Sequence, residues 1–456
     1  MVLSACLVRV KQPVPLMSKN KLSRRGFLKS AATAAAGVIT FPYIVPSSAL
    51  GKADAVAASS RITLGFVGVG DHGTRVNLKN FLGNPDTQVI AVCDVDSSHR
   101  EQARQMVNEK YANQDCAAYN DFRELTGRDD IDAVIVSTPD HWHVPVSIAA
   151  VRAGKDVYCE KPLSVTVAEG RALSDAVGRY GRIFQTGSEF RGAYNFHRAA
   201  ELVRNGRIGK LHTIRVYLPM NPDFPGDPTP MPVPKELDYD MWLGPAPFTP
   251  YTKDRVHFNY RWILDYSGGL ICDWGAHLVD QAQWANETEY SGPVEIQGAG
   301  KYLSEGLYDT AVKFNVEYKY ANGVTLVCSD KYPWLGGSIR YEGCEGMIFA
   351  RYSGYHGRDI TAEPASILKS VIGVDEIHLY TCSGGPERNF LDCVRTRKLC
   401  YYPAEIGHRS VTVCHLGNIA MLLGRKLRWD PDKERFDNDR QANRMLSRAM
   451  RSPWHL

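Results

Sequence analysis

The sequence lacks the patterns by which several classes of protein are recognised. None of the ten cysteines after residue 55 forms a C-x-x-C pair, and none is spaced with histidine as in a zinc finger. No internal repeat is present. The apolar stretch at residues 31–45 is broken by proline and is shorter than the roughly 20 residues that span a bilayer. We therefore expect no stable membrane span, no structural zinc module and few or no disulfides.

What the sequence does contain is the composition of a globular protein. Of 456 residues, 44% are hydrophobic and 23% are charged, which excludes a largely disordered chain or a collagen-like fibre. The length favours two domains. The first 55 residues hold eight Lys/Arg and one acidic residue, a net charge of +7. Because the whole chain has a net charge of +4, the remaining 401 residues have a net charge of −3. A mildly acidic body gives no electrostatic reason to bind nucleic acid.

The basic leader has the order of an export signal. Arg24 and Arg25 lie in the sequence SRRGFLK, ahead of the apolar stretch, and a small-residue cleavage site follows at residues 53–55. This pattern predicts a twin-arginine signal and linker over residues 1–58, with Met1 or Met17 as the start; a disordered basic tail is the alternative. We therefore expect export to the periplasm by the twin-arginine machinery, which carries folded proteins and is compatible with free thiols.

Residues 61–160 alternate strand-like and helix-like segments. The strand-like segments are 61–67, 89–94, 132–137 and 156–159, and the helix-like segments between them are 74–81, 97–111 and 144–153. Alternation at these lengths predicts an α/β domain with a doubly wound parallel sheet and right-handed crossovers.

The pattern changes after a helix-like stretch at residues 168–180. Strand-like segments without regular intervening helices follow at 211–218, 294–301, 311–318, 325–329 and 346–350. They predict an α+β second half with an open, mainly antiparallel sheet. Residues 219–250 hold ten prolines and form an irregular insertion. We predict a first domain over residues 59–190, a second over 191–429, and a tail over 430–456 that packs on the body.

Gly68, Gly70 and Gly73 form a G-x-G-x-x-G motif between the first strand and the first helix, and Asp94 ends the second strand 21 residues later. In this context the motif predicts a Rossmann domain that binds a dinucleotide. Gly68 permits the tight turn, Gly70 lets the pyrophosphate approach the backbone, and Gly73 lets helix and strand pack closely. Asp94 would accept hydrogen bonds from the adenosine ribose and repel a 2′-phosphate. This favours NAD; the alternative is NADP, with Arg100 reaching the 2′-phosphate.

Two loops follow strands whose carboxyl ends should line the ligand crevice. Thr138, Pro139 and His143 after the third strand are predicted to flank the cofactor, with an ordinary loop histidine as the alternative for His143. Glu160 and Lys161 in an E-K-P tripeptide follow the fourth strand. Lys161 would lie beside the nicotinamide and polarise a substrate hydroxyl, whereas a surface lysine is the default for so short a motif.

Asp273 and His277 are four residues apart and would share one face of a helix. An imidazole oriented by a carboxylate suits a general base. The pair could instead be structural or, as a lesser option, supply metal ligands together with Asp280. The candidate substrate-binding residues lie in the preceding aromatic and Arg-rich segment, with packing around the insertion as an equal alternative; they are His257, Arg261 and Tyr266.

Together these stretches resemble the Gfo/Idh/MocA oxidoreductases, the group that includes glucose–fructose oxidoreductase and inositol dehydrogenase. The resemblance covers nearly all of residues 61–456, and exported members with twin-arginine leaders look most similar. It implies that Lys161, Asp273 and His277 are catalytic without a metal. It also implies a second-domain sheet that covers the nicotinamide and often builds a dimer, so we expect a homo-oligomer, either a dimer or a tetramer.

We therefore predict an NAD(P)-dependent oxidoreductase that transfers hydride between a sugar, glycoside or polyol hydroxyl and a nicotinamide cofactor, with His277 taking the hydroxyl proton. A protein exported in the folded state must load its cofactor beforehand, so we expect tightly bound NAD. One alternative is an NAD-dependent glycosidase that acts through transient ring oxidation, whose family has a T-H-G type segment where this chain has D-W-G. The other is a non-catalytic protein that binds sugar or NAD, against which the three retained catalytic residues argue.

Overall fold

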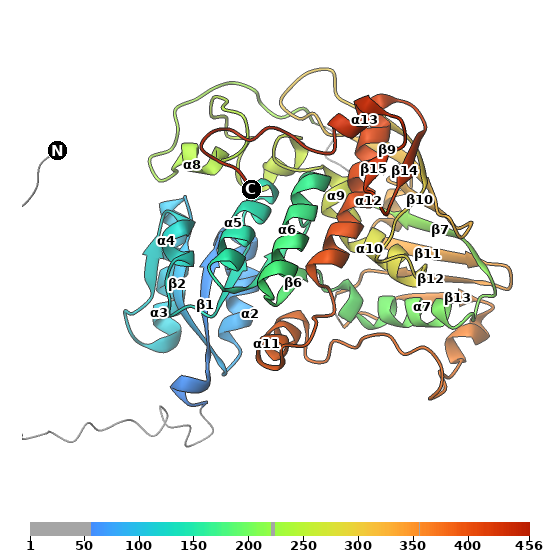
Figure 1. The fold of residues 1–456 in the computed structure, drawn as a ribbon, viewed down its shortest axis with the longest axis horizontal. Helices are drawn as coiled ribbons and strands as arrows, with labels where there is room; N and C mark the ends of the chain where they lie inside the picture. The colour runs from blue at the N-terminus through green and yellow to red at the C-terminus, as the bar shows by residue number, and fades with distance from the viewer. Residues whose placement is uncertain (1–55, 220–223, 355) are drawn as a thin grey trace, which may run out of the picture. The chain divides into compact units, whose positions relative to one another are not determined.

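The computed structural model describes residues 56–219, 224–354 and 356–456, so the predicted leader lies almost entirely outside the described residues. The first half of the body is built on six parallel strands in the order β3-β2-β1-β4-β5-β6 (Figure 1). The strands are β1 (Ile62–Val67), β2 (Thr87–Cys93), β3 (Ala117–Tyr119), β4 (Ala133–Val136), β5 (Asp156–Glu160) and β6 (Phe184–Gly187). The helices are α2 (Lys79–Leu82), α3 (Ser97–Tyr111), α4 (Phe122–Thr126), α5 (Asp140–Arg152) and α6 (Val167–Tyr180).

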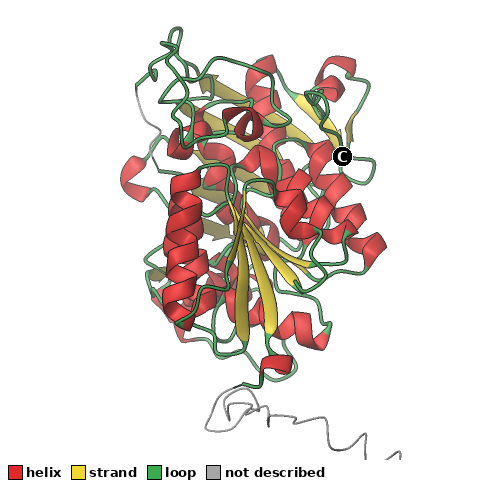
Figure 2. Ribbon diagram, turned by 90° about the vertical axis from the view of Figure 1, so that its left-hand side faces the viewer, coloured by secondary structure: helices red, strands yellow, loops and turns green. Residues whose placement is uncertain are grey.

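Both faces of this sheet are covered. Every residue of β4 and β5 is buried, as expected for a parallel sheet between two helical layers, and Figure 2 shows helices on both sides of the strands. Successive side chains of β1 enter opposite cores, Phe66 on one face and Val67 on the other. The predicted doubly wound sheet is confirmed. Its strand order reverses between β1 and β4, which opens a crevice at their carboxyl ends.

The local predictions for this half need some corrections. β3 and β6 were not predicted, because β3 has only three residues and β6, with the sequence FQTG, has no alternating apolar pattern. The first helix opens with a π-helical turn at Gly73–Leu78. α5 begins at Asp140 rather than 144, directly after Pro139, so His143 lies in its first turn.

The second half contains a nine-stranded sheet in the order β13-β12-β11-β7-β10-β9-β8-β14-β15. Only β7 and β10 pair in parallel, so the predicted mainly antiparallel sheet is confirmed. Its strands are β7 (Leu211–Tyr217), β8 (Glu295–Lys301), β9 (Lys313–Lys319), β10 (Thr325–Ser329), β11 (Ser338–Gly343), β12 (Met347–Arg351), β13 (Ile360–Glu363), β14 (Leu427–Asp430) and β15 (Arg435–Phe436). β11 and β13–β15 were not predicted.

Helices cover one face of this second sheet. The helices of this half are α7 (Tyr194–Arg204), α8 (Tyr239–Leu243), α9 (Leu270–Asp273), α10 (Gly275–Ala285), α11 (Pro386–Thr396), α12 (Ala404–Leu423) and α13 (Arg440–Arg444). α10 is buried along its whole length and packs against α7, α12 and strands β7 and β11. The strands alternate accordingly, and β9 is exposed and buried at successive residues.

The C-terminal part of the chain returns to the first sheet. Phe390 of α11 packs edge-on against Phe81 and Tyr158, and the chain after α13 runs back to α5, where Trp454 contacts Trp142 (Figure 1). Because segments from the predicted second domain and tail pack on the first core, the division at residue 190 stays a prediction. Among the described residues, no helix combines the length and the apolarity needed to cross a membrane.

Candidate active site and cofactor cleft

A cleft of about 400 Å³ opens at the carboxyl ends of β1, β2, β4 and β5. Seven of the eight predicted cofactor-binding residues line it, together with the predicted catalytic lysine: Gly68, Gly70, Asp94, Thr138, Pro139, His143, Glu160 and Lys161. The eighth, Gly73, lies behind the loop. The topology therefore collects at one sheet edge residues that span almost a hundred positions of the sequence.

The glycine loop has the backbone that the motif predicts. Gly68 has φ +82°, and a Cβ on it would lie 2.6 Å from the backbone of Thr138. A Cβ on Gly73 would lie 2.3 Å from the carbonyl oxygen of Gly68, so that position serves the packing of helix against strand. A Cβ on Gly70 would meet only the ring of His99, at 3.6 Å. Gly70 is thus the position that faces the cleft.

Asp94 lies at the adenosine end of this cleft. One carboxylate oxygen accepts a hydrogen bond from N–H of Val69 at 2.8 Å, and the other accepts from N–H of Asp96 at 2.9 Å. Burial raises the pKa of Asp94, and these N–H groups oppose the rise. Each oxygen keeps a further lone pair for a ribose hydroxyl. Arg100 donates at 2.5 Å to the carbonyl oxygen of Asp94 and at 3.2 Å to Asn120, so its guanidinium is already partnered.

The loops after β4 and β5 are tied together by a buried histidine. The ring nitrogens of His143 lie 2.7 Å from the carbonyl oxygen of Pro162 and 2.9 Å from that of Thr138. His143 therefore sets the spacing of the two loops as well as lining the cleft. Oγ1 of Thr138 is buried and has no hydrogen-bond partner among the described residues. An unpaired buried hydroxyl in a cleft is a polar group available to a ligand.

Lys161 and Asp273 meet at the inner end of the cleft. Nζ of Lys161 donates to Oδ1 of Asp273 at 2.7 Å, and Nε of Arg261 lies 3.5 Å from the same oxygen. Burial alone would raise the pKa of Asp273, but the charges of Lys161 and Arg261 outweigh it and lower this pKa to about 2. Burial lowers the pKa of Lys161, but the Asp273 carboxylate raises it above its ordinary value. At neutral pH the pair is ionised.

His277 has a different partner from the one predicted. Its Nδ1 lies 2.7 Å from Oγ of Ser188, and its ring stacks on Phe190 with centroids 4.4 Å apart. The prediction that Asp273 orients His277 is wrong in its geometry, because α9 ends at Asp273 and a new helix starts at Gly275. Burial, followed by the charge of Lys161, lowers the pKa of His277 to about 4, so the imidazole is neutral at pH 7.

A polar cluster connects the glycine loop to the E-K-P loop. Oε1 of Glu160 lies 3.3 Å from Nε2 of His72 and accepts a hydrogen bond from Asn77 at 3.0 Å. Burial raises the pKa of Glu160, but the hydrogen bonds from His72 and Asn77 and the nearby positive charges together outweigh burial and lower this pKa to about 2. Glu160 therefore fixes the loop geometry as well as lining the cleft. Sequence reasoning missed His72, although its place inside the glycine motif was a usable signal, and missed Ser188, which carries no motif.

The three candidate substrate residues lie in different places. Arg261 reaches Asp273, as a substrate-site residue would. Tyr266 is completely buried, accepts a hydrogen bond from Arg255 and packs against Trp242, so its assignment to the substrate is wrong.

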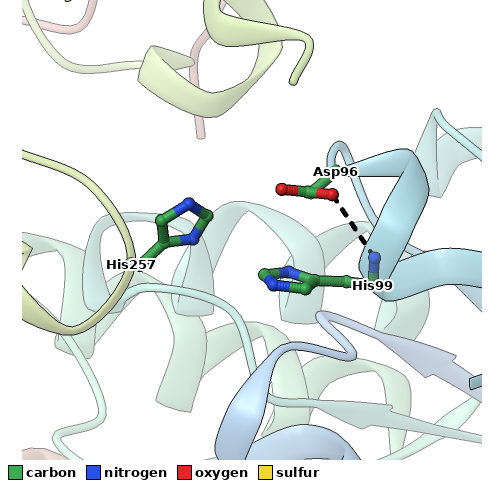
Figure 3. A group of neighbouring side chains, drawn as sticks. All are labelled: Asp96, His99 and His257. Atoms are coloured by element: carbon green, nitrogen blue, oxygen red, sulfur yellow. Dashed lines mark hydrogen bonds between the residues drawn. The ribbon is translucent and has the colours of Figure 1, made fainter. Parts of the chain in front are cut away.

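His257 lies at the opposite, adenosine end of the cleft. It faces Asp96 and His99 at the start of α3 (Figure 3), and the ring centroids of the two histidines are 5.2 Å apart. His257 lines the same cleft as Arg261, and its assignment to the substrate stays a prediction. Ligand atoms of Asp96, His99 and His257 lie within 4.8 Å of one another, and they are the group that could hold a metal ion among the described residues. Asp280, once a candidate ligand beside His277, instead binds Arg191 through both oxygens at 2.7 Å.

The insertion after β7 closes the adenosine end. We call residues 236–243 the strap. Its Glu236 carbonyl oxygen accepts from N–H of Ser97 at 2.8 Å, and N–H of Asp238 donates to the carbonyl oxygen of Val95 at 2.9 Å. Leu237, Met241 and Trp242 of the strap line the cleft. The strap is thus bonded to the backbone immediately after Asp94.

The C-terminal tail holds the strap from behind. Arg451 donates to the carboxylate of Asp240 at 2.5 Å and to the carbonyl oxygen of Gly244 at 2.9 Å. Trp454 packs on Trp142, with ring centroids 4.7 Å apart. Trp142 in turn lines the cleft.

These features fit a nicotinamide dinucleotide. The open backbone at Gly70 leaves space for a pyrophosphate, Asp94 has acceptor capacity for a ribose, and the buried hydroxyl of Thr138 lacks a partner. Lys161 lies at the same cleft and leads to Asp273 and His277. The nicotinamide end is therefore the end where acid–base groups gather.

Comparison with known proteins gives relatives of two kinds. A glycosyl hydrolase family 109 protein of Shewanella pealeana is 33% identical over 172 residues, but the match covers 35% of this chain and only 38% of that protein. Myo-inositol 2-dehydrogenase of Thermotoga maritima is 28% identical over 296 residues, covering 63% of this chain and 74% of that enzyme. The solved structure of aldose-aldose oxidoreductase from Caulobacter crescentus, complexed with glycerol, has a TM-score of 0.61 at 19% identity, covering 81% of this chain and 99% of that one. This last likeness concerns the fold alone.

Two family models match the halves of the body. The model of the NAD-binding Rossmann fold of the oxidoreductase family matches residues 62–188, and that of the family's C-terminal alpha/beta domain matches residues 226–456, just over half of the chain. The first match covers the glycine loop, Asp94 and Lys161, and the second covers Asp273 and His277. The chain belongs to the Gfo/Idh/MocA oxidoreductase family, and its cofactor is a nicotinamide dinucleotide.

Proposed function

We propose that this protein is an NAD-dependent oxidoreductase acting on a hydroxyl group of a sugar, glycoside or polyol. The observation that carries the proposal is the Lys161–Asp273 ion pair, which joins the loop after β5 to the end of α9 at the inner end of the cofactor cleft. In this proposal, the Lys161 cation and the neutral imidazole of His277 both act on the substrate hydroxyl beside the nicotinamide. The relative that acts on a polyol, myo-inositol 2-dehydrogenase, supports this substrate class.

The protein side chains have separate tasks in this reaction. When bound, the nicotinamide supplies the carbon that accepts or donates hydride. Lys161, held as a cation by Asp273, binds the hydroxyl oxygen and stabilises negative charge on it. His277, with Nδ1 engaged by Ser188, takes the hydroxyl proton at Nε2. Arg261 holds Asp273 from the other side and keeps its carboxylate ionised.

The adenosine end favours NAD over NADP. The carboxylate of Asp94 lines the cleft there and would repel a 2′-phosphate. Arg100 is engaged by the backbone of Asp94 and by Asn120, which limits what it can offer a phosphate.

We also propose that the protein is exported through the twin-arginine pathway and keeps its cofactor. The leader motif at residues 23–29 is the reason for the first part. The strap and the tail behind it support the second, because a dinucleotide under the strap leaves only after the Ser97–Glu236 and Asp238–Val95 hydrogen bonds open. A retained cofactor must be reoxidised in place by a second substrate, such as a keto-sugar, with ping-pong kinetics.

The test uses protein purified from the periplasm. Denaturing it and measuring NAD in the supernatant by mass spectrometry should give close to one equivalent per chain. Incubating the holoprotein with a panel of sugars and polyols, alone and with a second keto-sugar, should give reduction of the bound nicotinamide and then turnover. A protein that arrives empty and works only with added NAD would contradict retention, and one that reduces no nicotinamide with any panel member would contradict the oxidoreductase.

The second candidate is a glycosidase that uses bound NAD transiently. The Shewanella relative favours it, although that match spans less than half of the relative's length. Asp273 and Trp274 stand where the glycosidase family has a T-H-G type segment, which favours simple oxidoreduction. Release of p-nitrophenol from nitrophenyl glycosides, with no accumulation of NADH, would select the glycosidase. Binding of sugar without either reaction would select a non-catalytic role. The homo-oligomer stays a prediction, to be measured by light scattering.

A further inference from the structure

Asp96, His99 and His257 bring two walls of the cofactor cleft together. Asp96 and His99 belong to the start of α3 in the first half of the body, whereas His257 begins the 3₁₀ helix of the second half (His257–Trp262), 158 residues further along. Figure 3 shows the carboxylate and both imidazoles facing one space. Their ligand atoms lie within 4.8 Å of one another. Nothing in the proposed chemistry at Lys161 uses these groups, which lie at the other end of the cleft.

The donor atoms of this group are free to bind. Neither ring of His99 or His257 has a hydrogen bond to another described residue; the contact of each is with the other ring. The buried histidines His141, His143, His277, His408 and His415, in contrast, all have hydrogen-bond partners. Oδ1 of Asp96 accepts from N–H of Ser98 and of His99, and no described hydrogen bond ends on Oδ2.

The backbone presents His257 in an uncommon way. Its φ is +54°, in the left-handed region that few non-glycine residues occupy. The imidazole is exposed, and its ring faces Asp96 and His99 at the start of α3 (Figure 3). Strain kept at an exposed residue is a reason to look for a function of its side chain.

We propose that Asp96, His99 and His257 form a binding site for a divalent transition ion, with Zn²⁺ as the preferred class. Two imidazoles and one carboxylate are a common zinc donor set and leave a fourth position for water. Imidazole nitrogen selects zinc, cobalt, nickel or copper over Mg²⁺ and Ca²⁺. Ligands around zinc lie about 3.3 Å apart, so the three groups must move closer, which the exposed His257 side chain can do.

The ion would link the two walls at the rim of the cleft, and we call this link the staple. Bound to both walls, it would hold the 3₁₀ helix to α3 at the end where the strap already crosses. Dissociation of the dinucleotide would then require the bond between the ion and His257 to break first. This second part rests on the proposed retention of the cofactor, whereas the metal site itself does not.

The holoprotein is treated with a chelator and then titrated with Co²⁺, and binding is monitored by the visible absorption of tetrahedral Co²⁺. Zn²⁺ binding is measured by competition with Co²⁺, and Mg²⁺ is the control ion that should not bind. We expect one equivalent to bind. His99→Gln and His257→Asn should weaken binding by at least about 100-fold, and asparagine keeps the left-handed backbone accessible. Asp96→Asn should also weaken binding while preserving the helix cap. His212→Gln, at an exposed histidine of β7, is the matched control and should bind as the wild type does.

Two results would overturn the proposal. Absence of stoichiometric binding, or binding that His257→Asn leaves unchanged, would remove the site. For the staple, release of bound NAD is followed by fluorescence after dilution, with Zn²⁺ or with chelator. We expect Zn²⁺ to slow release about tenfold in the wild type and not in His257→Asn. Release that Zn²⁺ leaves unchanged in a protein that binds it would overturn the staple but not the site. These readouts do not depend on turnover, so a failure of the proposed enzyme activity is distinguishable from a failure of this inference.

Discussion

Replacing Lys161 with methionine tests the proposed site most directly. The substitution keeps the length of the side chain and removes the charge that Asp273 binds at 2.7 Å. Removing one partner of a buried ion pair costs roughly 3–5 kcal/mol when the other is left alone. Here Asp273 keeps Arg261 at 3.5 Å, so we expect the free energy of unfolding to fall by only about 1–3 kcal/mol. The variant should therefore fold and can be assayed.

The substitution should lower the turnover rate by a much larger factor than its small effect on the free energy of unfolding would suggest. Loss of a positioned group that stabilises the developing charge typically costs about 10²–10⁴-fold in turnover. The pH profile gives a second and more specific readout. The charge of Lys161 is, after burial, the strongest influence that lowers the pKa of His277 to about 4. In Lys161→Met this pKa should rise toward its ordinary value near 6.5, so that activity is lost at higher pH than in the wild type.

The assay follows nicotinamide absorbance in single turnovers of the holoprotein between pH 4 and 8, with the best substrate of the panel. Lys161→Arg is the matched control, because it keeps the charge. Its acid limb, the pH range in which activity is lost on acidification, should stay at the low pH of the wild type even if turnover drops. Bound NAD is quantified in each variant to separate chemistry from cofactor loss. Turnover in Lys161→Met within tenfold of the wild type, or an acid limb that does not move, would refute the roles we give to Lys161 and His277.

The remaining predictions concern single residues. His277→Ala should lower turnover by about 10²–10⁴-fold with NAD content nearly intact, and near-normal turnover would exclude it as the base. Asp94→Ala should weaken NAD binding and relax discrimination against NADP, as measured by the ratio of the two dissociation constants; a wild type that prefers NADP would contradict this. Trp454→Ala should speed NAD release about 3–10-fold, since it removes an aromatic contact behind the strap, and an unchanged release rate would argue against the tail's role. Burial lowers the pKa of His141 to about 3 and that of His277 to about 4. Between pH 4 and 6.5 the unfolded chain therefore binds more protons than the folded protein does. The free energy of unfolding should fall as the pH falls through this range, by roughly 3 kcal/mol for each histidine. Urea midpoints measured across this range check that loss, and a flat profile would contradict the neutral histidines.

Local patterns in the sequence predicted the architecture well where they were strong. The buried runs of β1, β2, β4 and β5 and the glycine motif between β1 and the first helix required only short-range regularities, which the chain displays directly. Short or polar elements such as β3 and β6 were not predicted, because a strand of three or four residues has too few positions to show an alternation of apolar and polar residues.

The candidate site was predicted residue by residue but not contact by contact. Asp94, Lys161 and His277 could be named from motifs, because each motif has a fixed place after a strand or in a helix. Their partners could not. The bond from Lys161 to Asp273 joins positions 112 residues apart, and that from Ser188 to His277 joins positions 89 apart. Spacing of four along the sequence suggested Asp273 as the partner of His277, but a helix break at Trp274 decided otherwise.

The sequence by itself therefore determined the two-sheet plan and the cofactor loop and named the candidate acid–base groups, since each depends on neighbours within a few residues along the chain. Only the tertiary structure decided which charges pair, that the strap and tail close over the adenosine end, and that His257 faces Asp96 and His99. The physical reason is that ion pairs, stacked rings and ligand sets are set by distances of a few ångströms in space, and residues far apart in the chain reach those distances only when both sheets and their connections are folded.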